Sequence, residues 1–296
     1  MASTHTVEGM DSGAPAIELG VPVIGGSYRR ATSGTAGLAV SEAERSEKFA
    51  QMRAGELGSL HSWELVTAVD GPGTRLTTFL SGCPLRCLYC HNPDTMEMRR
   101  GESVTAEELL KRVARYRGIF EVTGGGLTIS GGEPLMQPAF VARLLRGAQE
   151  LGVHTAIDTS GYLGAHCTDA MLADIDLVLL DVKSGVPETY QKTTGRELQP
   201  TLDFGQRVAA GGTEIWIRFV LVPGLTDALE NVAAVADYVA GLSTVSRVEV
   251  LPFHQMGQDK WASLGMAYEL DGTPAPSPEL VARVRDQFRE RDLTVF

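Results

Sequence analysis

DLVLLDV, residues 176–182, is a short apolar run that begins with one aspartate and ends just after another. A run of this kind is typical of a strand that is buried on one or both faces of a sheet. Five further strands are predicted from similar runs along the chain. They are TRLTTFL (74–80), GLTIS (126–130), VHTAID (153–158), EIWIRFVLV (214–222) and RVEVLPF (247–253).

Amphipathic stretches that are typical of helices lie between these strands. They are residues 105–117, 138–152, 202–212 and 229–242. Thr105, followed three residues later by Glu108, matches a capping box, which satisfies free amides at a helix start. The alternation predicts an α/β fold in which helices cover a parallel sheet. Because about six βα units are fewer than the eight of a closed barrel, we expect a partial, open TIM-like barrel with a lateral mouth wide enough for a macromolecular substrate.

Polar residues follow or end five of the predicted strands, and Arg218 lies within the strand at 214–222. Since parallel strands send their carboxyl ends to one edge, we expect these residues to converge on one rim. They are Cys83, the segment SGGE (130–133), the segment DTSG (158–161), Asp181 with Lys183, Arg218 and His254.

The first 57 residues differ from the rest, because Gly, Ser, Thr and Ala dominate them. We expect residues 1–57 to form a flexible N-terminal extension with one short polar helix in 41–55, and residues 58–296 to form the core domain. The start of the chain has neither a basic segment nor a continuous apolar stretch, so no signal peptide is expected.

Composition narrows the class of protein. The net charge of −11 argues against a nucleic-acid partner, which would require a basic face. No run approaches the roughly 18 apolar residues that span a bilayer, so no membrane association is expected. Only four cysteines occur in 296 residues, which does not make a disulfide framework and favours a reducing cytoplasm.

Three of the four cysteines, Cys83, Cys87 and Cys90, lie in SGCPLRCLYCHNPDT (81–95) with the spacing C-x3-C-x2-C. Three thiolates suit an iron-sulfur cluster or zinc. A 4Fe-4S cluster held here would leave one iron without a thiolate. Zinc with His91 as the fourth ligand is the main alternative, although adjacent residues seldom both reach one tetrahedral metal. A redox C-x-x-C pair would leave Cys83 unused, and burial of all three as small apolar residues fits poorly with the polar neighbours.

The three-cysteine spacing with the aromatic Tyr89 before the last cysteine resembles the signature of radical S-adenosylmethionine enzymes. In that family the open iron binds the methionine part of S-adenosylmethionine, and one electron then cleaves it to a 5′-deoxyadenosyl radical that abstracts hydrogen. From about residue 58 onward the chain further resembles the pyruvate formate-lyase activating enzymes. The matching segments, in chain order, are 68–75, 87–95, 130–135, 154–161, 179–183, 216–224, 251–257 and 259–265.

This resemblance implies a role for each of the rim residues. It implies that the three cysteines hold the cluster, and that the following residues contact S-adenosylmethionine: Tyr89, Cys90, His91, Gly131, Gly132, Glu133, Asp181, Val182, Lys183, Arg218 and His254. Asn92 is a further candidate beside the adenine. Ordinary structural readings stay open for several of them, namely a turn at SGGE, a surface ion pair between Asp181 and Lys183, an internal salt bridge for Arg218 and a structural histidine at 254.

The resemblance also implies that Asp70 lies near a glycine loop of the protein substrate and belongs with the catalytic residues, although Asp in VDGPG is also common in turns. Asp158, Thr159 and Asp181 match a monovalent-cation site, where Ser160 replaces a frequent Asn. Cys167 receives no role and is expected to be a free thiol.

The implied function is activation of pyruvate formate-lyase by formation of a glycyl radical, with reduced flavodoxin or ferredoxin as electron donor and the enzyme as a monomer. Two alternatives stay open. One is an activase of another glycyl-radical enzyme, many of which carry inserted cysteine clusters that are absent between Cys90 and Gly131. The other is a zinc-binding interaction protein without turnover.

Overall fold

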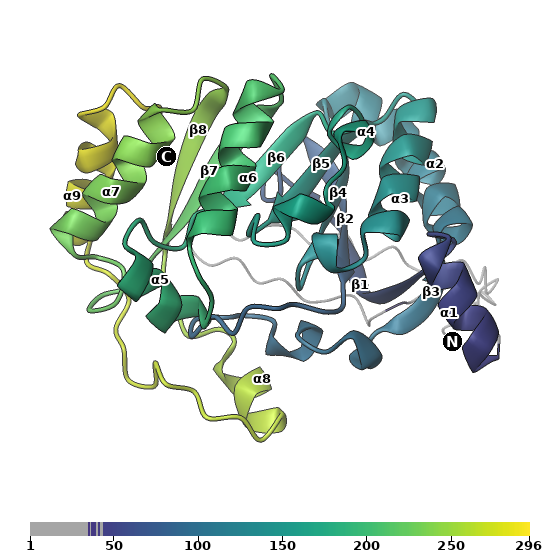
Figure 1. The fold of residues 1–296 in the computed structure, drawn as a ribbon, viewed down its shortest axis with the longest axis horizontal. Helices are drawn as coiled ribbons and strands as arrows, with labels where there is room; N and C mark the ends of the chain where they lie inside the picture. The colour runs from purple at the N-terminus through teal and green to yellow at the C-terminus, as the bar shows by residue number, and fades with distance from the viewer. Residues whose placement is uncertain (1–34, 36, 40, 42–43) are drawn as a thin grey trace, which may run out of the picture. The chain divides into compact units, whose positions relative to one another are not determined.

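One eight-stranded sheet organises the residues that the computed structural model describes, which are 35, 37–39, 41 and 44–296 (Figure 1). The strands lie in the order β3-β1-β2-β4-β5-β6-β7-β8. Their bounds are β1 (Leu57–Thr67), β2 (Thr74–Leu80), β3 (Glu102–Thr105), β4 (Gly126–Gly131), β5 (His154–Thr159), β6 (Leu177–Asp181), β7 (Glu214–Leu221) and β8 (Val245–Pro252). Within the described residues β3 and β8 form the two edges, so the predicted open, partial barrel is confirmed.

All six predicted strands are present, and β2 and β4 to β8 pair in parallel as expected. Two further strands were not predicted: β1 is antiparallel to β2, and β3 is antiparallel to β1. Glycine, serine and histidine interrupt the apolar pattern of β1, and its register shifts between Leu60 and Ser62. The sequence of β1 therefore lacks the clean alternation that identifies a strand.

The run at 176–182 becomes β6, in the middle of the sheet, and it is buried on both faces. Val178 and Leu180 belong to the main core between the sheet and the helices. Leu177 and Leu179 point to the opposite face, where they pack with Ala156 and Trp216. The side chains alternate between two apolar environments, which explains why the strand has no polar residue before Asp181.

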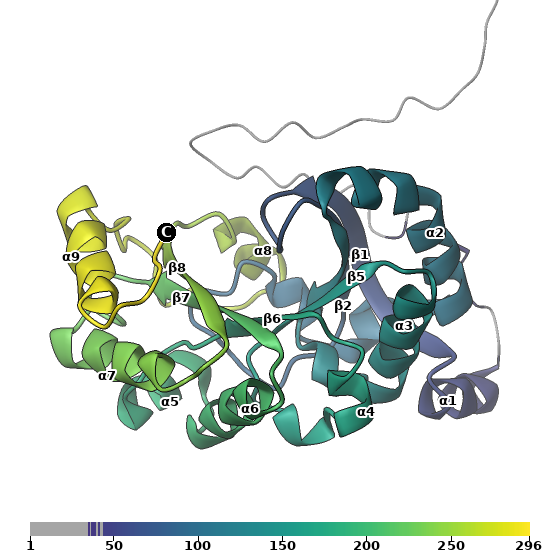
Figure 2. The same cartoon turned by 90° about the horizontal axis from the view of Figure 1, so that it is seen from above.

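Helices α7, α6, α4, α3 and α2 follow an arc along one side of the curved sheet (Figure 2). The bounds of the α-helices are α1 (Arg45–Arg53), α2 (Ala106–Thr123), α3 (Pro138–Glu150), α4 (Asp169–Leu172), α5 (Pro187–Thr194), α6 (Gln199–Ala210), α7 (Leu229–Ala240), α8 (Gln258–Ser263) and α9 (Pro278–Arg289), and the short 3-10 helices are η1 (Pro93–Thr95), η2 (Met98–Arg100), η3 (Pro134–Met136) and η4 (Gly164–His166). The four helical stretches predicted from the sequence correspond to α2, α3, α6 and α7, whereas α4, α5, α8 and α9 were not predicted. In Figure 1, α5 and α8 lie at the lower edge of the sheet, where the strands end. No helix among the described residues has the length and apolar character that a bilayer span requires.

The described part of residues 35–57 contacts the core domain. Helix α1 lies inside the predicted stretch 41–55. Leu38 packs against the main core, Arg112 donates a hydrogen bond to the carbonyl of Gly37, and the amide of Ser41 donates to the carbonyl of Ser103 at 2.7 Å. The rest of the predicted extension lies outside the described residues, and the boundary at residue 57 stays a prediction.

The start of α2 gives a direct test of the capping analysis. The Thr105 hydroxyl accepts a hydrogen bond from the amide of Glu108 at 3.2 Å. We expect Thr105→Ala to lower the free energy of unfolding by about 1 kcal/mol, because one amide of the first turn loses its acceptor. Anaerobic urea unfolding measures this, with Thr105→Ser as the control that keeps the cap. Equal losses in both variants would contradict the capping role.

Candidate functional site

The three predicted metal-binding cysteines lie on one loop between β2 and η1. Two backbone amides of this loop are hydrogen-bonded to the end of α5. The amide of Arg86 donates to the carbonyl of Thr194 at 2.8 Å, and the amide of Leu88 donates to the carbonyl of Thr193 at 3.0 Å. Along this loop the side chains alternate. Leu85, Cys87 and Tyr89 are buried, whereas Arg86 is exposed and Leu88 is half-buried.

The buried side of the cysteine loop is apolar. Leu85, Cys87 and Tyr89 form a small cluster with Val222, Phe253 and Leu270, and Cys83 and Cys90 pack at its margin. All three cysteines are free thiols. Burial raises the pKa of the Cys83 and Cys87 thiols well above the usual range and that of Cys90 to about 12. The loop thus places three desolvated thiols on one wall of the site.

Gly131 and Gly132 join the second predicted motif to the cysteine loop. The amide of Gly132 donates to the carbonyl of Leu80 at 2.8 Å, and the amide of Glu133 donates to that of Gly82 at 2.8 Å. A Cβ atom on Gly131 would lie 2.1 Å from the Leu80 nitrogen, and one on Gly132 would lie 2.4 Å from the Gly82 oxygen. Gly131 also has a φ of 122°, which favours glycine. Both glycines are therefore required for the two loops to interlock.

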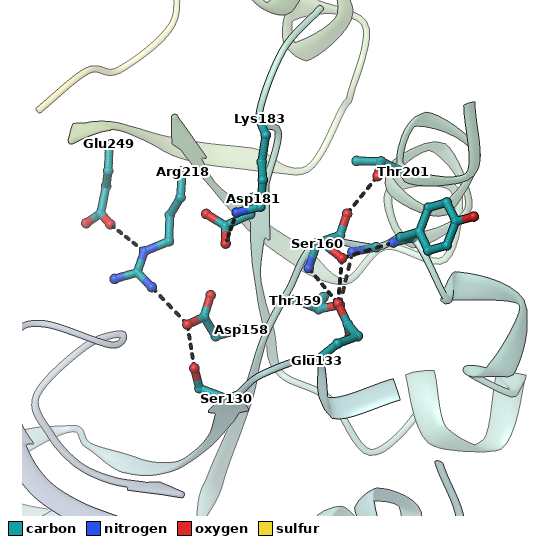
Figure 3. Close-up of polar contacts among 12 residues, drawn as sticks. Ser130, Glu133, Asp158, Thr159, Ser160, Asp181, Lys183, Thr201, Arg218 and Glu249 are labelled. Carbon is teal, nitrogen blue, oxygen red and sulfur yellow. Dashed lines mark hydrogen bonds and ion pairs between the residues drawn. The ribbon is translucent and has the colours of Figure 1, made fainter. Parts of the chain in front are cut away.

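Glu133 is buried, and its carboxylate binds the loop after β5 (Figure 3). It accepts hydrogen bonds from the Thr159 hydroxyl at 2.6 Å, the Ser160 hydroxyl at 2.6 Å and the Ser160 amide at 3.0 Å. It also accepts from the amide of Leu135 at 3.1 Å. These contacts make Glu133 a support that fixes the ends of β4 and β5 relative to each other.

Lys183 and Asp181 point to the same side of β6, as their alternation predicts. Lys183 Nζ lies 2.9 Å from Asp181 Oδ2 and 5.7 Å from the centroid of the Tyr89 ring. Burial, the largest single effect, opposes the charge of Lys183, but the charge and hydrogen bond of Asp181 together with the neighbouring Tyr89 and Cys87 outweigh it and hold the pKa of the ammonium well above its usual value. The buried Tyr89 hydroxyl, whose pKa burial raises, has no hydrogen-bond partner within the described residues. The pair is therefore buried beside the cysteine loop rather than on the surface.

Arg218 lies on β7 among three carboxylates, and Figure 3 shows its contacts with two of them, Asp158 and Glu249. Its guanidinium is 3.1 Å from Asp158, 3.3 Å from Glu249 and 3.4 Å from Asp70. Burial opposes the charge of Arg218, but these carboxylates outweigh it and raise its pKa. The structure contains the internal salt bridge that was the structural alternative for Arg218 in the sequence analysis. Direct contact of Arg218 with a cofactor stays a prediction.

Asp158, Thr159 and Asp181, the predicted cation ligands, come from neighbouring strands. Asp158 Oδ2 accepts from Ser130 and pairs with Arg218, whereas its buried Oδ1 has no partner among the described residues. The Thr159 hydroxyl donates to Glu133. Burial, the largest cause, raises the pKa of Asp158 despite the charge of Arg218. The monovalent-cation site stays a prediction. The unpartnered Oδ1 makes Asp158 the strongest candidate ligand among the three residues.

His91 and His254 lie together at the far end of the cysteine loop. Their ring centroids are 4.2 Å apart, and His91 Nε2 is 3.1 Å from the carbonyl oxygen of His254. Burial lowers the pKa of His254, which favours its neutral form. The structure thus brings together two histidines that the sequence separates by 163 positions.

Two other predicted residues lie elsewhere. The Val182 side chain is buried in the main core, so only its backbone faces the site, and its amide donates to the carbonyl of Arg218 at 3.1 Å. Cys167 is a free thiol as expected, buried in the main core away from the cysteine loop.

Sequence reasoning missed three supporting residues: Glu249, Lys260 and Trp261. Trp261 Nε1 donates to the Cys90 carbonyl at 2.9 Å. Lys260 Nζ lies 2.9 Å from the Asn92 amide oxygen, to which it donates, and 3.0 Å from Asp94. Lys260 and Trp261 both lie in the segment 259–265, which resembles the family but was given no role from the sequence. This resemblance was the one feature of the sequence that could have pointed to them.

Asp94 connects this end of the loop to β1 and α8. It accepts from His61 Nε2 at 2.9 Å, and these bonds from His61 and Lys260 outweigh burial and lower the pKa of its carboxyl to about 2. Because the folded pKa lies below the ordinary value of 3.8, the ionised carboxylate stabilises the fold above that value, and this contribution is lost as the pH falls towards 2.

We expect the melting temperature of iron-free protein to be lower in Asp94→Asn than in the native chain at pH 6, with the gap closing below about pH 4. Thermal unfolding between pH 6 and pH 3 measures this. A gap that stays constant with pH would show that the charge of Asp94 is not what stabilises the loop.

Comparison with known proteins adds independent findings. Residues 77–236 match the Radical SAM superfamily model. The chain is 39% identical over 231 residues to the pyruvate formate-lyase 1-activating enzyme of Escherichia coli K12, which covers 77% of this chain and 94% of the relative. It is 42% identical over 234 residues to the pyruvate formate-lyase-activating enzyme of Clostridium pasteurianum, covering 79% of this chain and 98% of the relative.

A solved structure supports the fold alone. The radical SAM methyltransferase from Sphaerobacter thermophilus superposes with a TM-score of 0.57 at 16% identity, covering 86% of this chain and 81% of that chain. With the three-cysteine loop and the near-complete coverage of the two activating enzymes, these findings establish that the chain belongs to the radical SAM superfamily and, within it, to the pyruvate formate-lyase activating enzymes.

Proposed function

We propose that this enzyme activates pyruvate formate-lyase by removing one hydrogen atom from a backbone glycine, with a 4Fe-4S cluster and S-adenosylmethionine as cofactors. The observation that carries the proposal is the loop on which Cys83, Cys87 and Cys90 lie against the SGGE segment and Lys183. A match over 94% of the length of a named activating enzyme supports the same function.

The residues of the cysteine loop fit an iron-sulfur cluster. Burial keeps the thiols neutral in the absence of a metal, so binding of iron would displace their protons and form the thiolates that such clusters require. Among the described residues, no three His, Cys, Asp or Glu side chains lie close enough together to hold a single metal ion. An iron-sulfur cluster does not require such close ligands, because each thiolate would bind a different iron. The three thiolates would leave one iron for S-adenosylmethionine.

The residues beside the cysteines fit S-adenosylmethionine. The Tyr89 hydroxyl is buried without a partner, and the Lys183 ammonium is desolvated beside it, which suits a carboxylate ligand. The glycines at 131 and 132 allow this strand end to pack directly against the cysteine loop. We assign Asp181, His91 and His254 to the same pocket, and the unpartnered oxygen of Asp158 to a monovalent cation.

The chemistry that these cofactors supply when bound is one-electron cleavage of S-adenosylmethionine to methionine and a 5′-deoxyadenosyl group that takes the glycine hydrogen. The protein contributes positioning. Glu133 fixes the ends of β4 and β5, Arg218 neutralises three buried carboxylates, and the apolar cluster around Phe253 excludes water from the cysteines. No side chain is required to act as a general acid or base.

The open mouth of the sheet suits a protein substrate. Asp70 lies in the loop between β1 and β2, and its carboxylate faces Arg218 inside the barrel. We assign Asp70 to the side on which the glycine loop of the substrate enters. Asp70→Asn tests this assignment, because it should slow glycyl-radical formation more than it slows cofactor cleavage in the absence of the substrate protein.

The alternatives find less support. An activase with inserted cysteine clusters would require extra residues between Cys90 and Gly131, whereas that segment consists of η1, η2, β3 and α2 of the core fold. A zinc protein without turnover does not fit the family. We further propose that the enzyme is a monomer and that it receives its electron from reduced flavodoxin or ferredoxin. We also propose that it works in the cytoplasm, and the free thiols at all four cysteines support such a reducing compartment.

The deciding experiment is anaerobic. Reconstituted enzyme, reductant and S-adenosylmethionine are mixed with a pyruvate formate-lyase, and the EPR spectrum and 5′-deoxyadenosine are recorded. We expect a glycyl-radical doublet with stoichiometric 5′-deoxyadenosine. Deoxyadenosine without the doublet would reject this substrate in favour of another glycyl-radical enzyme, and the absence of both from enzyme with a reducible cluster would reject the function.

A further inference from the structure

We propose that the outer side of the cysteine loop is the docking surface for an acidic one-electron carrier protein. This surface, the outer loop face, consists of Arg86, Leu88, Arg196, Trp261 and Met266. The inference rests on the proposed function, because that reaction consumes one electron that the enzyme must receive from outside. It specifies where the electron enters, which the family assignment leaves open.

The first observation is the alternation along the cysteine loop. Cys87 is buried, while Arg86 before it and Leu88 after it face outward. A protein that touches these two side chains is therefore one residue away from a cluster ligand. Since electron transfer between proteins weakens steeply with distance, contact at this face gives a carrier a short route to the cysteines.

The second observation is a depression beside the same two residues. Its volume is about 370 Å³, and it is lined by Arg86, Leu88, Trp261, Met266, Ala267 and Glu269. Four of its lining residues are apolar and two, Arg86 and Glu269, are charged, a mixture of apolar and charged groups that is also found in protein interfaces. The indole N–H of Trp261 donates to the Cys90 carbonyl at 2.9 Å, so one wall is hydrogen-bonded to the cysteine loop. A small interface is the norm for redox partners that must also dissociate.

The third observation is charge. Arg86 Nη1 donates to the carbonyls of Cys83 and Leu85, both at 2.7 Å, and Arg196 Nε donates to that of Pro84 at 2.8 Å. Neither guanidinium forms an ion pair within the described part of this chain. By contrast, the nearby Arg99 is neutralised by Glu97 at 2.6 Å.

Two unneutralised arginines on successive carbonyls of the cysteine loop are notable in a chain whose net charge is −11. Glu269, at the rim of the depression, is the carboxylate that a carrier would meet there. The arginines attract an acidic protein, and they orient it with its redox centre towards the cysteines.

The electron balance at this face is simple. The flavin or iron-sulfur centre of the carrier loses one electron and the oxidised cluster gains it. No bond forms or breaks, and no proton has to cross the interface. The face therefore needs only contact and orientation, which the apolar lining residues and the two arginines supply.

Binding provides the first test. The double variant Arg86→Gln with Arg196→Glu is compared with the native enzyme and with Arg115→Glu, which changes an exposed arginine on α2. Titration calorimetry measures the Kd of oxidised flavodoxin for cluster-loaded protein at low and high salt. We expect about tenfold weaker binding by the double variant at low salt, a smaller difference at high salt and no change in the control. Native affinity in the double variant, or an equal loss in the control, would overturn the proposal.

Reduction kinetics provide the second test. Reduced flavodoxin should reduce the cluster of the double variant more slowly than the native cluster, whereas photoreduced deazaflavin, which needs no docking, should reduce both at equal rates. If the double variant fails to take up the cluster, Arg196→Glu alone replaces it, because residue 196 lies outside the cysteine loop.

The outcomes separate this proposal from the proposed function. Slower glycyl-radical formation with deazaflavin would show that the outer loop face binds the substrate protein instead of the carrier, which overturns the docking assignment. Failure of the native enzyme to cleave S-adenosylmethionine with deazaflavin would reject the function, while the calorimetric result still decides whether the face binds flavodoxin.

Discussion

Cys87→Ala is expected to abolish cleavage of S-adenosylmethionine, with no 5′-deoxyadenosine detectable above the level without enzyme. Cys87 is the most deeply buried of the three cysteines on the loop, and no other cysteine lies near enough to replace it. Removal of its thiolate would leave two ligands for a cluster that needs three from the protein. Iron and acid-labile sulfide analysis, together with product assay after anaerobic reconstitution, measures the effect, and Cys83→Ala and Cys90→Ala should behave alike.

Cys167→Ala is the matched control. Cys167 is also a buried free thiol, but it packs in the main core between η4 and α4. Its truncation should cost stability without loss of iron, sulfide or product. Retained cleavage in any of the three loop variants, or loss of the cluster in Cys167→Ala, would contradict the assignment of the ligands.

Arg218→Met is expected to destabilise the fold by about 3–5 kcal/mol, because it removes the cation that three buried carboxylates share. The side chains of Asp70, Asp158 and Glu249 are 1%, 14% and 13% exposed. Without Arg218, Asp70 and Asp158 would keep their burial but lose this cation, whereas Glu249 keeps Arg247, whose Nε lies 2.9 Å from it. The folded pKa of Asp158, which burial already raises, should therefore rise further above its unfolded value. Such a group costs stability as the pH rises, and the deficit should therefore be larger at pH 8 than at pH 5.

Anaerobic urea unfolding at the two pH values measures both the deficit and its pH dependence. Arg289→Met is the control, because Arg289 pairs with Asp286 on the surface of α9 with both side chains more than half exposed. Such a pair contributes about 0–1 kcal/mol. A loss of that size in Arg218→Met, or a deficit that grows towards acid pH, would exclude the neutralising role of Arg218.

The sequence was sufficient for the parallel part of the sheet because each of its strands is a short run rich in apolar or β-branched residues, and several of these runs, such as β6, are buried on both faces. Strand β1 was missed because its residues alternate imperfectly around a register shift. Helix α9 was not predicted either, although Ser277 caps it by accepting from the amide of Leu280. The start of α9 is therefore marked by a local capping residue in the sequence.

The site residues also fall into those that local sequence predicts and those that only the folded sheet brings together. The spacing of the cysteines and the position of Lys183 two residues after Asp181 are local, so the sequence could suggest their roles. The acceptor role of Glu133 towards Thr159 and Ser160, and the meeting of Arg218 with Asp70 across 148 positions, depend on how strands lie side by side. Pairings of this range are properties of the folded sheet, and no single stretch of sequence encodes them.

The interlocking of the cysteine loop with the glycines at 131 and 132 has a consequence for the thermodynamics of ligand binding. Backbone hydrogen bonds already hold the two loops together, and Glu133 ties both to the end of β5. The conformational entropy of these segments is therefore lost when the protein folds rather than when the cofactor arrives. Association with S-adenosylmethionine should then show little of the entropic penalty that accompanies the ordering of mobile loops, so most of the contact energy is available as affinity.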